Sequence, residues 1–201
     1  MINFAIQCIV WFIVLSVLMS FIEHQIHQHL MHRKSPLSVI VPNLNKVFEH
    51  HAVLHHGYYY DIFDDEPVAP GKDKGLRLNY FEGFLEALPI AAIIAIFSLL
   101  GAAMFFVVVM LHHFFWNKIH VEMHKPEKRF FSDWPLYKRL ARHHYLHHRH
   151  RDKNFNVVLP IADIVLGTNA RATRTDLKGM YNANLFSRRR EPNKILSQKA
   201  S

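Results

Sequence analysis

Residues 87–117 read ALPIAAIIAIFSLLGAAMFFVVVMLHHFFWN and contain no Asp, Glu, Lys or Arg. A helix needs about twenty apolar residues to cross roughly 30 Å of hydrocarbon, so this block is long for one span and short for two. Gly101, near its middle, suits a tight turn, and the flanking aromatic residues complete both arms. We therefore predict a membrane hairpin with arms at 80–100 and 102–119.

A second uncharged stretch, INFAIQCIVWFIVLSVLMSFI, occupies residues 2–22. Its length predicts another membrane span. A cleaved signal peptide fits poorly, because no basic residue precedes the stretch and no small-residue cleavage site follows it. So long an uncharged run also argues against a buried helix of a soluble protein. We expect an all-α integral membrane protein with three spans.

All seventeen histidines of the chain lie in four short clusters. The clusters fall within residues 24–32, 50–56, 112–124 and 143–150. Imidazole is the commonest metal ligand among side chains, and pairs three to five residues apart on helices can aim at one point. An isolated histidine is more often a core or surface residue, whereas four clusters predict a metal site. Cys8 is the only cysteine, so a cysteine-based zinc or iron–sulfur site is excluded within one chain.

The hairpin brings the clusters before and after it to one side of the membrane, because two crossings return the chain to the side it left. Lys and Arg populate 33–77 and 118–199 but are absent from the apolar block. The positive-inside rule then predicts a cytoplasmic histidine-bearing side and C-terminus, in a bacterial inner membrane or the endoplasmic reticulum. Anionic lipid head groups or an acidic partner explain the net charge of +8 more simply than nucleic acid does.

We expect one membrane-embedded domain over residues 1–170 and a basic, loosely ordered tail over 171–201. The first helix is predicted to continue to His32 and to carry its cluster into a cytosolic helical cap. Further helices are predicted at 43–60 and 135–150. Residues 61–75 are rich in Pro, Gly and charge and are expected to form a loop.

The spacings yield ten candidate metal ligands, and since one ion takes four to six, they predict a dimetal site. The candidates are His27, His32, His51, His55, His56, His120, His124, His144, His147 and His148. His143 competes with His144 for the same role. On an α-helix, His27 and His32 lie about 140° apart, so both would reach one site only from a flank. The remaining histidines are expected in supporting, interfacial or surface roles: His24, His29, His50, His112, His113 and His150.

Each of several other residues near the clusters has two possible roles. Glu23, Glu122 and Asp163 are candidates to orient imidazoles through the second ring nitrogen, or else are ordinary surface carboxylates. Asn117 is either a polar contact near the metal or a helix-surface residue. A further set either lines a lipid channel or anchors the chain at the membrane interface: Trp116, Tyr145 and Tyr58–Tyr60.

Three spacings resemble the histidine boxes of the fatty acid hydroxylase/sterol desaturase superfamily: His27-x4-His32, His51-x3-His55-His56 and His144-x2-His147-His148. The pair His120-x3-His124 and the segment 154–168 also fit, so the resemblance covers about residues 20–170. It implies a membrane di-iron oxygenase that uses O2 as co-substrate and two electrons. Such an enzyme hydroxylates or desaturates an unactivated C–H bond of a lipid, whether fatty acyl, sterol or carotenoid.

The resemblance also implies two Fe ions as cofactor, with Zn as a possible substitute in purified protein. The chain has no room for a fused cytochrome b5 domain, so electrons are expected from a separate ferredoxin or cytochrome b5 type donor. Its three predicted spans are fewer than the four that larger relatives use. The alternatives are a membrane metal-handling protein or an inactive relative, and a zinc-dependent lipid hydrolase, which would not need ten histidines.

Overall fold

The computed structural model describes residues 3–36, 44–66 and 76–186, and every regular element within them is helical. Three helices are long and apolar enough to cross a membrane. They are α1 (Phe4–Ile26), α4 (Tyr80–Phe97) and α5 (Leu99–His124). The all-helical fold with three candidate spans is therefore confirmed.

The turn of the hairpin lies at Ser98, not at Gly101 as predicted. Ser98 has extended dihedral angles (φ −160°, ψ 115°), and its Oγ accepts a hydrogen bond of 3.0 Å from the Gly101 N–H as the N-cap of α5. Gly101 lies inside α5, where an added Cβ would be 2.9 Å from the Trp11 indole. This glycine therefore lets α1 and α5 approach closely instead of making the turn.

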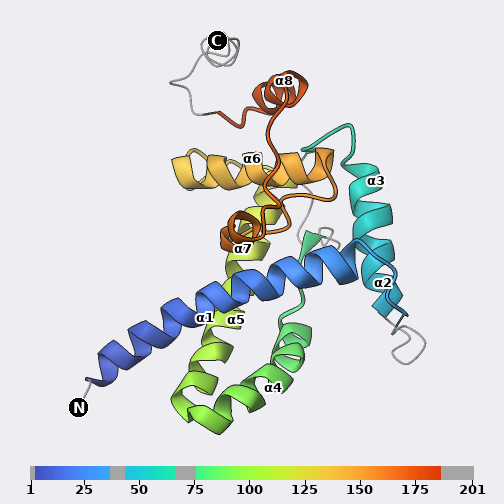
Figure 1. The fold of residues 1–201 in the computed structure, drawn as a ribbon. Helices are drawn as coiled ribbons and strands as arrows, with labels where there is room; N and C mark the ends of the chain where they lie inside the picture. Colours follow the sequence, from blue (N-terminus) through green and yellow to red (C-terminus); the bar gives the residue numbers. More distant parts are fainter. Residues whose placement is uncertain (1–2, 37–43, 67–75, 187–201) are drawn as a thin grey trace.

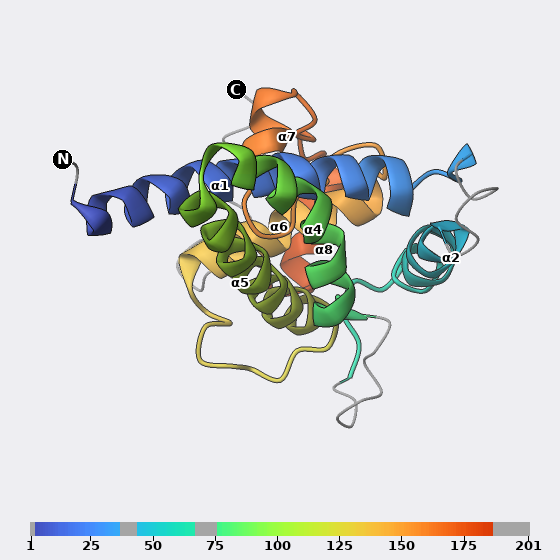
Figure 2. The same ribbon diagram turned by 90° about the horizontal axis from the view of Figure 1, so that it is seen from below.

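The three long helices share an apolar core. α4 runs beside α5, and α1 crosses α5 at an angle (Figures 1 and 2). Leu15, Ala87 and Phe105 are buried where the helices meet. The outer faces are apolar too, and Phe97 near the turn is 82% exposed. Apolar side chains on both the inner and the outer surface fit a bundle surrounded by lipid.

Two segments that follow α1 in the chain contain π-helical turns. α1 passes directly into a π-helical turn, η1 (His27–Met31), which fits the predicted extension to His32. Residues 44–58 form one further rod of α2 (Leu44–Phe48), π-helical η3 (Glu49–His55) and α3 (His56–Tyr58), beside the C-terminal end of α1 (Figure 1).

The C-terminal part covers the end of α5. α6 (Pro135–Arg149) matches the helix predicted at 135–150 and lies across that end (Figure 1). α7 (Ile161–Val165) packs on α1, and α8 (Arg174–Asn182) packs on α6.

The helix α8 corrects the prediction of a loosely ordered tail over 171–201. A capping box between Thr173 and Asp176 starts α8, and Asp176 also pairs at 3.0 Å with His150, the residue that follows α6. Residues 187–201 lie outside the described part of the chain.

Candidate metal centre

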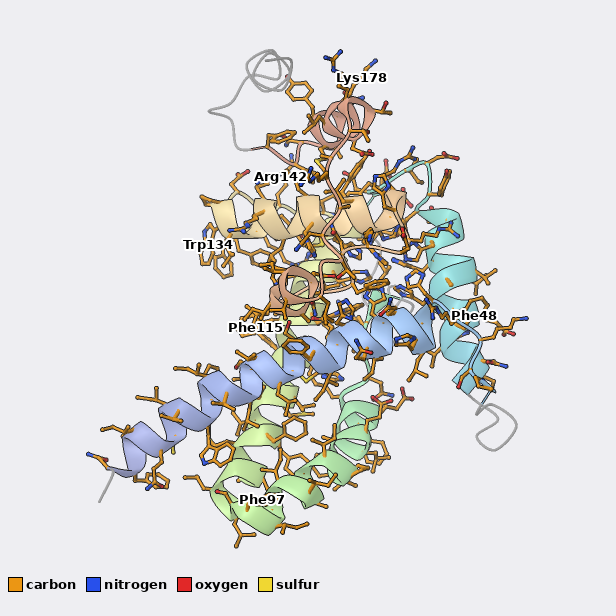
Figure 3. The ribbon with its side chains drawn as sticks, in the orientation of Figure 1. Phe48, Phe97, Phe115, Trp134, Arg142 and Lys178 are labelled. Atoms are coloured by element: carbon orange, nitrogen blue, oxygen red, sulfur yellow. The ribbon has the colours of Figure 1, made fainter. Side chains whose placement is uncertain are left out.

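The ten histidines predicted as ligands gather where the end of α1, the η3–α3 rod, α5 and α6 meet; ring nitrogens crowd this region in Figure 3. They form three overlapping groups, and within each group the ligand nitrogens lie within 4.8 Å of one another. The first group is His27, His32, His51, His56 and His147. The second is His55, His120, His124 and His144, and the third, His55, His56 and His148, joins the two. Metal ligation by these residues stays a prediction.

The π-helical turn η1 brings His27 and His32 onto one side. The His32 N–H donates to the His27 carbonyl at 3.2 Å, the bond to the fifth residue back that defines a π-helix. The two rings stack with centroids 5.1 Å apart. The expectation that these residues reach one site only from a flank was wrong, because it assumed α-helical geometry.

The second π-helical segment does the same for His51 and His56. The His56 N–H donates to the His51 carbonyl, and the two Nε2 atoms lie 3.2 Å apart. His55 packs beside His51, with ring centroids 5.1 Å apart, but its ligand nitrogen belongs to the second and third groups. This short rod therefore supplies ligand atoms to both groups.

Backbone carbonyls fix the orientation of four imidazoles through their Nδ1 atoms. The pairs are His27 with Phe155, His124 with Phe63 (2.7 Å), His147 with Lys153 (2.7 Å) and His120 with Leu76 (3.1 Å). Because a carbonyl oxygen only accepts, each Nδ1 carries the proton and each Nε2 keeps a lone pair. Sequence reasoning missed these carbonyls, since any residue type can supply one.

Ring nitrogens of the two groups face one another at short distances. His147 Nε2 lies 3.0 Å from the Nε2 atoms of both His32 and His56. His124 Nε2 lies 3.0 Å from His144 Nε2, which is 3.1 Å from His148 Nε2. Because His147 and His124 present lone pairs here, each of their contacts requires a proton or a cation between the two nitrogens. A metal ion would meet this requirement in both groups.

Some buried ring nitrogens have no hydrogen-bond partner within the described residues. Both nitrogens of His55 and Nε2 of His120 are in this state, and so are the Nδ1 atoms of His56, His144 and His148. A buried polar atom without a partner costs about 1–3 kcal/mol. His55 and His120 lie in the same group, where a metal ion would provide the missing partner.

Burial keeps these imidazoles uncharged at neutral pH. Burial, followed by the nearby His27 and Arg151 side chains, lowers the pKa of His32 to about 3. Burial is also the largest cause that lowers the pKa values of His55 and His147 well below the usual range. A neutral imidazole is the form that binds metal, so the site is prepared for a cation.

The three candidate carboxylates contact none of the ten histidines through a hydrogen bond in the described structure. Glu23 accepts from the Val157 N–H at 2.9 Å. Glu122 pairs with Arg129. Asp163 accepts from the backbone N–H groups of Phe155 and Asn156, at 2.9 and 2.7 Å. Backbone carbonyls, not these carboxylates, therefore orient the candidate ligands. Asp163 contributes indirectly, because it holds the Phe155 backbone whose carbonyl contacts His27.

The geometry separates His143 from His144. His144 is fully buried within the second group. The Nε2–H of His143 donates to Asp163 Oδ2 at 2.9 Å, and His143 lies outside all three groups. His29 and His50 are exposed beside the candidate ligands. Of the four other histidines, His24 contacts Thr168, His150 contacts Asp176, and His112 and His113 are buried within α5.

The flanking polar and aromatic residues have different positions. Asn117 holds the Leu78 backbone through hydrogen bonds of 2.6 and 3.0 Å. Leu78 lies two residues after Leu76, whose carbonyl accepts from His120 Nδ1. Trp116 packs on His120 with centroids 4.0 Å apart and lines a cavity between the spans. Tyr59 covers His124, whereas Tyr145 packs on Phe63 away from that cavity.

Comparisons of the chain with models of protein families, with curated proteins and with solved structures find no match. The resemblance to the fatty acid hydroxylase/sterol desaturase superfamily therefore remains a prediction from the histidine spacings.

Proposed function

We propose that this chain is a membrane di-iron oxygenase that hydroxylates, or desaturates, an unactivated C–H bond of a lipid. The observation that carries the proposal is two groups of converging imidazole nitrogens joined through His55, His56 and His148. Two linked groups correspond to two ions near each other, more than a single structural zinc requires.

The donor set fits iron. All ligand atoms of the groups are neutral imidazole nitrogens, which suit iron, zinc and copper. Iron, when bound there, would supply the activation of O2 that oxidation of an alkyl C–H bond requires. Zinc would occupy the same nitrogens in protein purified without added iron, but it has no redox chemistry.

The protein's own contribution is to fix the rings and to exclude water. The Nδ1–H groups of His27, His120, His124 and His147 donate to carbonyls, so these rings cannot rotate without breaking a buried hydrogen bond. His56 and the second-group ligands His124 and His144 are fully buried. A dry site protects a reactive oxidant from side reactions with solvent.

The position of the groups suits a lipid substrate. His27 belongs to the first group and also lines the apolar cavity between α1, α4 and α5. A chain that enters this cavity from the bilayer would reach the metal centre without leaving an apolar environment. Fatty acyl, sterol and carotenoid substrates all satisfy this requirement.

Electrons would come from a separate acidic donor of the ferredoxin or cytochrome b5 type. Arg149 and Arg151 both pack on the exposed Tyr60 ring, at 5.2 and 5.5 Å. Arg151 also donates to the carbonyl of His56 at 3.1 Å. This basic surface therefore lies directly over a candidate ligand, and its charge favours an acidic partner. We assign it to the cytoplasmic side, in a cytosolic cap above the three spans.

Oxygen-isotope incorporation tests the proposal. Iron-supplied protein in vesicles of host-membrane lipid extract would receive 18O2 and a chemical reductant. We expect lipid products that carry 18O in a new hydroxyl, or new alkenes, and loss of both with His55→Ala. His29→Ala, an exposed histidine of the same cap, should retain activity. Products without 18O and without new double bonds would contradict the proposal.

A further inference from the structure

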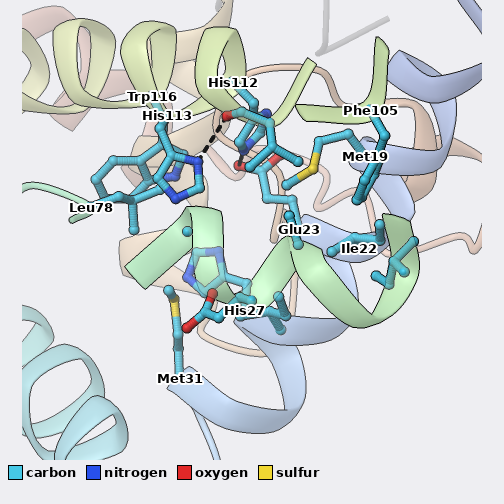
Figure 4. Close-up of a pocket in the computed structure, with 16 residues that line it drawn as sticks. Met19, Ile22, Glu23, His27, Met31, Leu78, Phe105, His112, His113 and Trp116 are labelled. Carbon is cyan, nitrogen blue, oxygen red and sulfur yellow. Dashed lines mark hydrogen bonds and ion pairs between the residues drawn. The ribbon is translucent and has the colours of Figure 1, made fainter. Parts of the chain in front are cut away.

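A cavity of about 120 Å³ lies between α1, α4 and α5. Most of its lining is apolar, from residues such as Ile22, Ala87 and Phe105. Figure 4 shows that His112 lies at one side of the cavity and His27 and Met31 at the opposite side. The cavity therefore connects a polar position inside the spans with the first histidine group.

Two neighbouring histidines of α5 line this cavity without belonging to any metal group. His112 and His113 are 8% and 7% exposed. Ionisable residues inside a membrane span are costly and usually mark a functional position. Neither is used by the proposed metal chemistry, so both require another explanation.

His113 presents a hydrogen-bond acceptor. Its Nδ1 lies 3.0 Å from the Val109 carbonyl, so Nδ1 carries the proton and Nε2 keeps a lone pair. No group among the described residues pairs with this Nε2. An added Cβ at Gly83 would lie 2.2 Å from this nitrogen, so only glycine at this position makes room for the His113 ring beside α4 at the edge of the cavity.

The other polar groups of the cavity define the charge of a ligand. His112 Nε2 faces Glu23 Oε1 at 3.8 Å, and Asn156 Nδ2 donates to Glu23 Oε2 at 2.9 Å. Glu86 also lines the cavity. No Lys or Arg is among the described residues that line the cavity, so an anionic ligand, such as a free fatty acid carboxylate, would have no fixed positive partner. An uncharged group that donates a hydrogen bond fits His113, and among lipids this group is a hydroxyl.

We infer that the cavity binds a hydroxyl-bearing lipid whose O–H donates to His113 Nε2 and whose apolar body extends toward His27. This inference rests on the proposed function only in treating that lipid as the substrate. Binding itself requires neither iron nor O2. The hydroxyl would hold the lipid in one register, so that a fixed carbon lies at the metal centre.

Fluorescence quenching of Trp116, which lines the same cavity, tests the inference. Trp11→Phe and Trp134→Phe together leave Trp116 as the only tryptophan of the chain. The probes are a terminally brominated undecanol and its methyl ether, which keeps the oxygen but cannot donate. One hydrogen bond of about 1 kcal/mol predicts half-quenching at a roughly three- to ten-fold lower concentration of the alcohol.

Variants of His113 assign the preference to this residue. His113→Phe should remove the difference between the two probes, and His113→Gln should retain it, because the amide oxygen accepts. Equal quenching by alcohol and ether in the parent protein would overturn the inference, whether or not the variants fold. A preference that survives in His113→Phe would overturn it as well. Because no metal is needed, failure here is distinct from failure to oxidise lipid.

Discussion

His147 Nε2 lies 3.0 Å from His56 Nε2, although 91 residues separate the two histidines in the chain. His147 donates its Nδ1 proton to Lys153, so its side of this contact is a lone pair. The contact exists only when α3 and α6 are packed together. A cation bound there would connect these elements, so metal binding and stability should be coupled.

Removal of metal should lower the thermal stability of the protein. A ligand at about 100 times its Kd stabilises the folded state by about 2.7 kcal/mol per site, which corresponds to roughly 5–10 °C in Tm for a chain of this size. Thermal scans in detergent before and after chelation measure the change. An unchanged Tm after verified metal removal would show that no ion links these helices.

The metal-free protein should also lose stability as the pH falls below about 6.5. The pKa of His32 is lowered to about 3, mainly by burial, so the unfolded state binds more protons between these values. Stability is fully present above the unfolded pKa and declines from pH 6.5 toward pH 3. Denaturant unfolding across this range measures the slope, and a stability independent of pH between 6.5 and 4 would contradict the buried neutral imidazoles.

Asp163→Ala should both destabilise the fold and weaken metal retention. The side chain accepts hydrogen bonds from two buried N–H groups, of Phe155 and Asn156, and the carbonyl of Phe155 holds His27. Two unsatisfied buried donors predict a loss of about 2–5 kcal/mol. Asp152→Ala, at an exposed position, serves as the matched control and should change neither stability nor metal content. Normal metal retention in Asp163→Ala would show that Asp163 does not support metal binding.

Glu122→Ala should destabilise the protein without changing the metal bound per folded chain. The buried carboxylate accepts from Arg129, from Ser132 Oγ at 2.5 Å and from the Glu127 N–H at 3.1 Å. Its removal predicts a loss of about 2–4 kcal/mol. Glu127→Ala, in a surface pair, should cost less than about 1 kcal/mol. Loss of metal from folded Glu122→Ala protein would contradict this prediction and show that Glu122 supports the metal site.

Cysteine labelling tests the membrane arrangement. On a Cys8→Ala background, which has no other cysteine, Ser98→Cys lies at the hairpin turn and Asp152→Cys lies in the cap. A membrane-impermeant maleimide should label Asp152→Cys only from the cytoplasmic side and Ser98→Cys only from the other side. Labelling of both positions from the same side would contradict the hairpin.

The sequence predicted the spans well because length and hydrophobicity alone determine which segments can cross a bilayer. The turn at Ser98 was missed because glycine is the stronger turn signal, whereas here Gly101 is required for contact with Trp11. Helix α8 was missed because it is short and polar, and because it packs against α6, a contact that the local sequence does not reveal.

The composition of the candidate site was predicted more completely than its geometry. Imidazole spacing identified the ten histidines that come together, since the residue type itself carries the chemistry. The π-helical turns that align His27 with His32 leave no simple signal in side-chain pattern. The carbonyls that orient His124 and His147 leave none either, because they depend on tertiary packing.

Metal content per chain is the most direct test of the dimetal centre. Untagged protein from iron-supplied cells, purified gently in detergent, would be compared with His55→Ala and His148→Ala, and with the exposed-site controls His29→Ala and His50→Ala. We predict about two iron ions per chain in the parent and both controls, with loss in His55→Ala and His148→Ala. One ion or none, unchanged by these substitutions, would contradict the account.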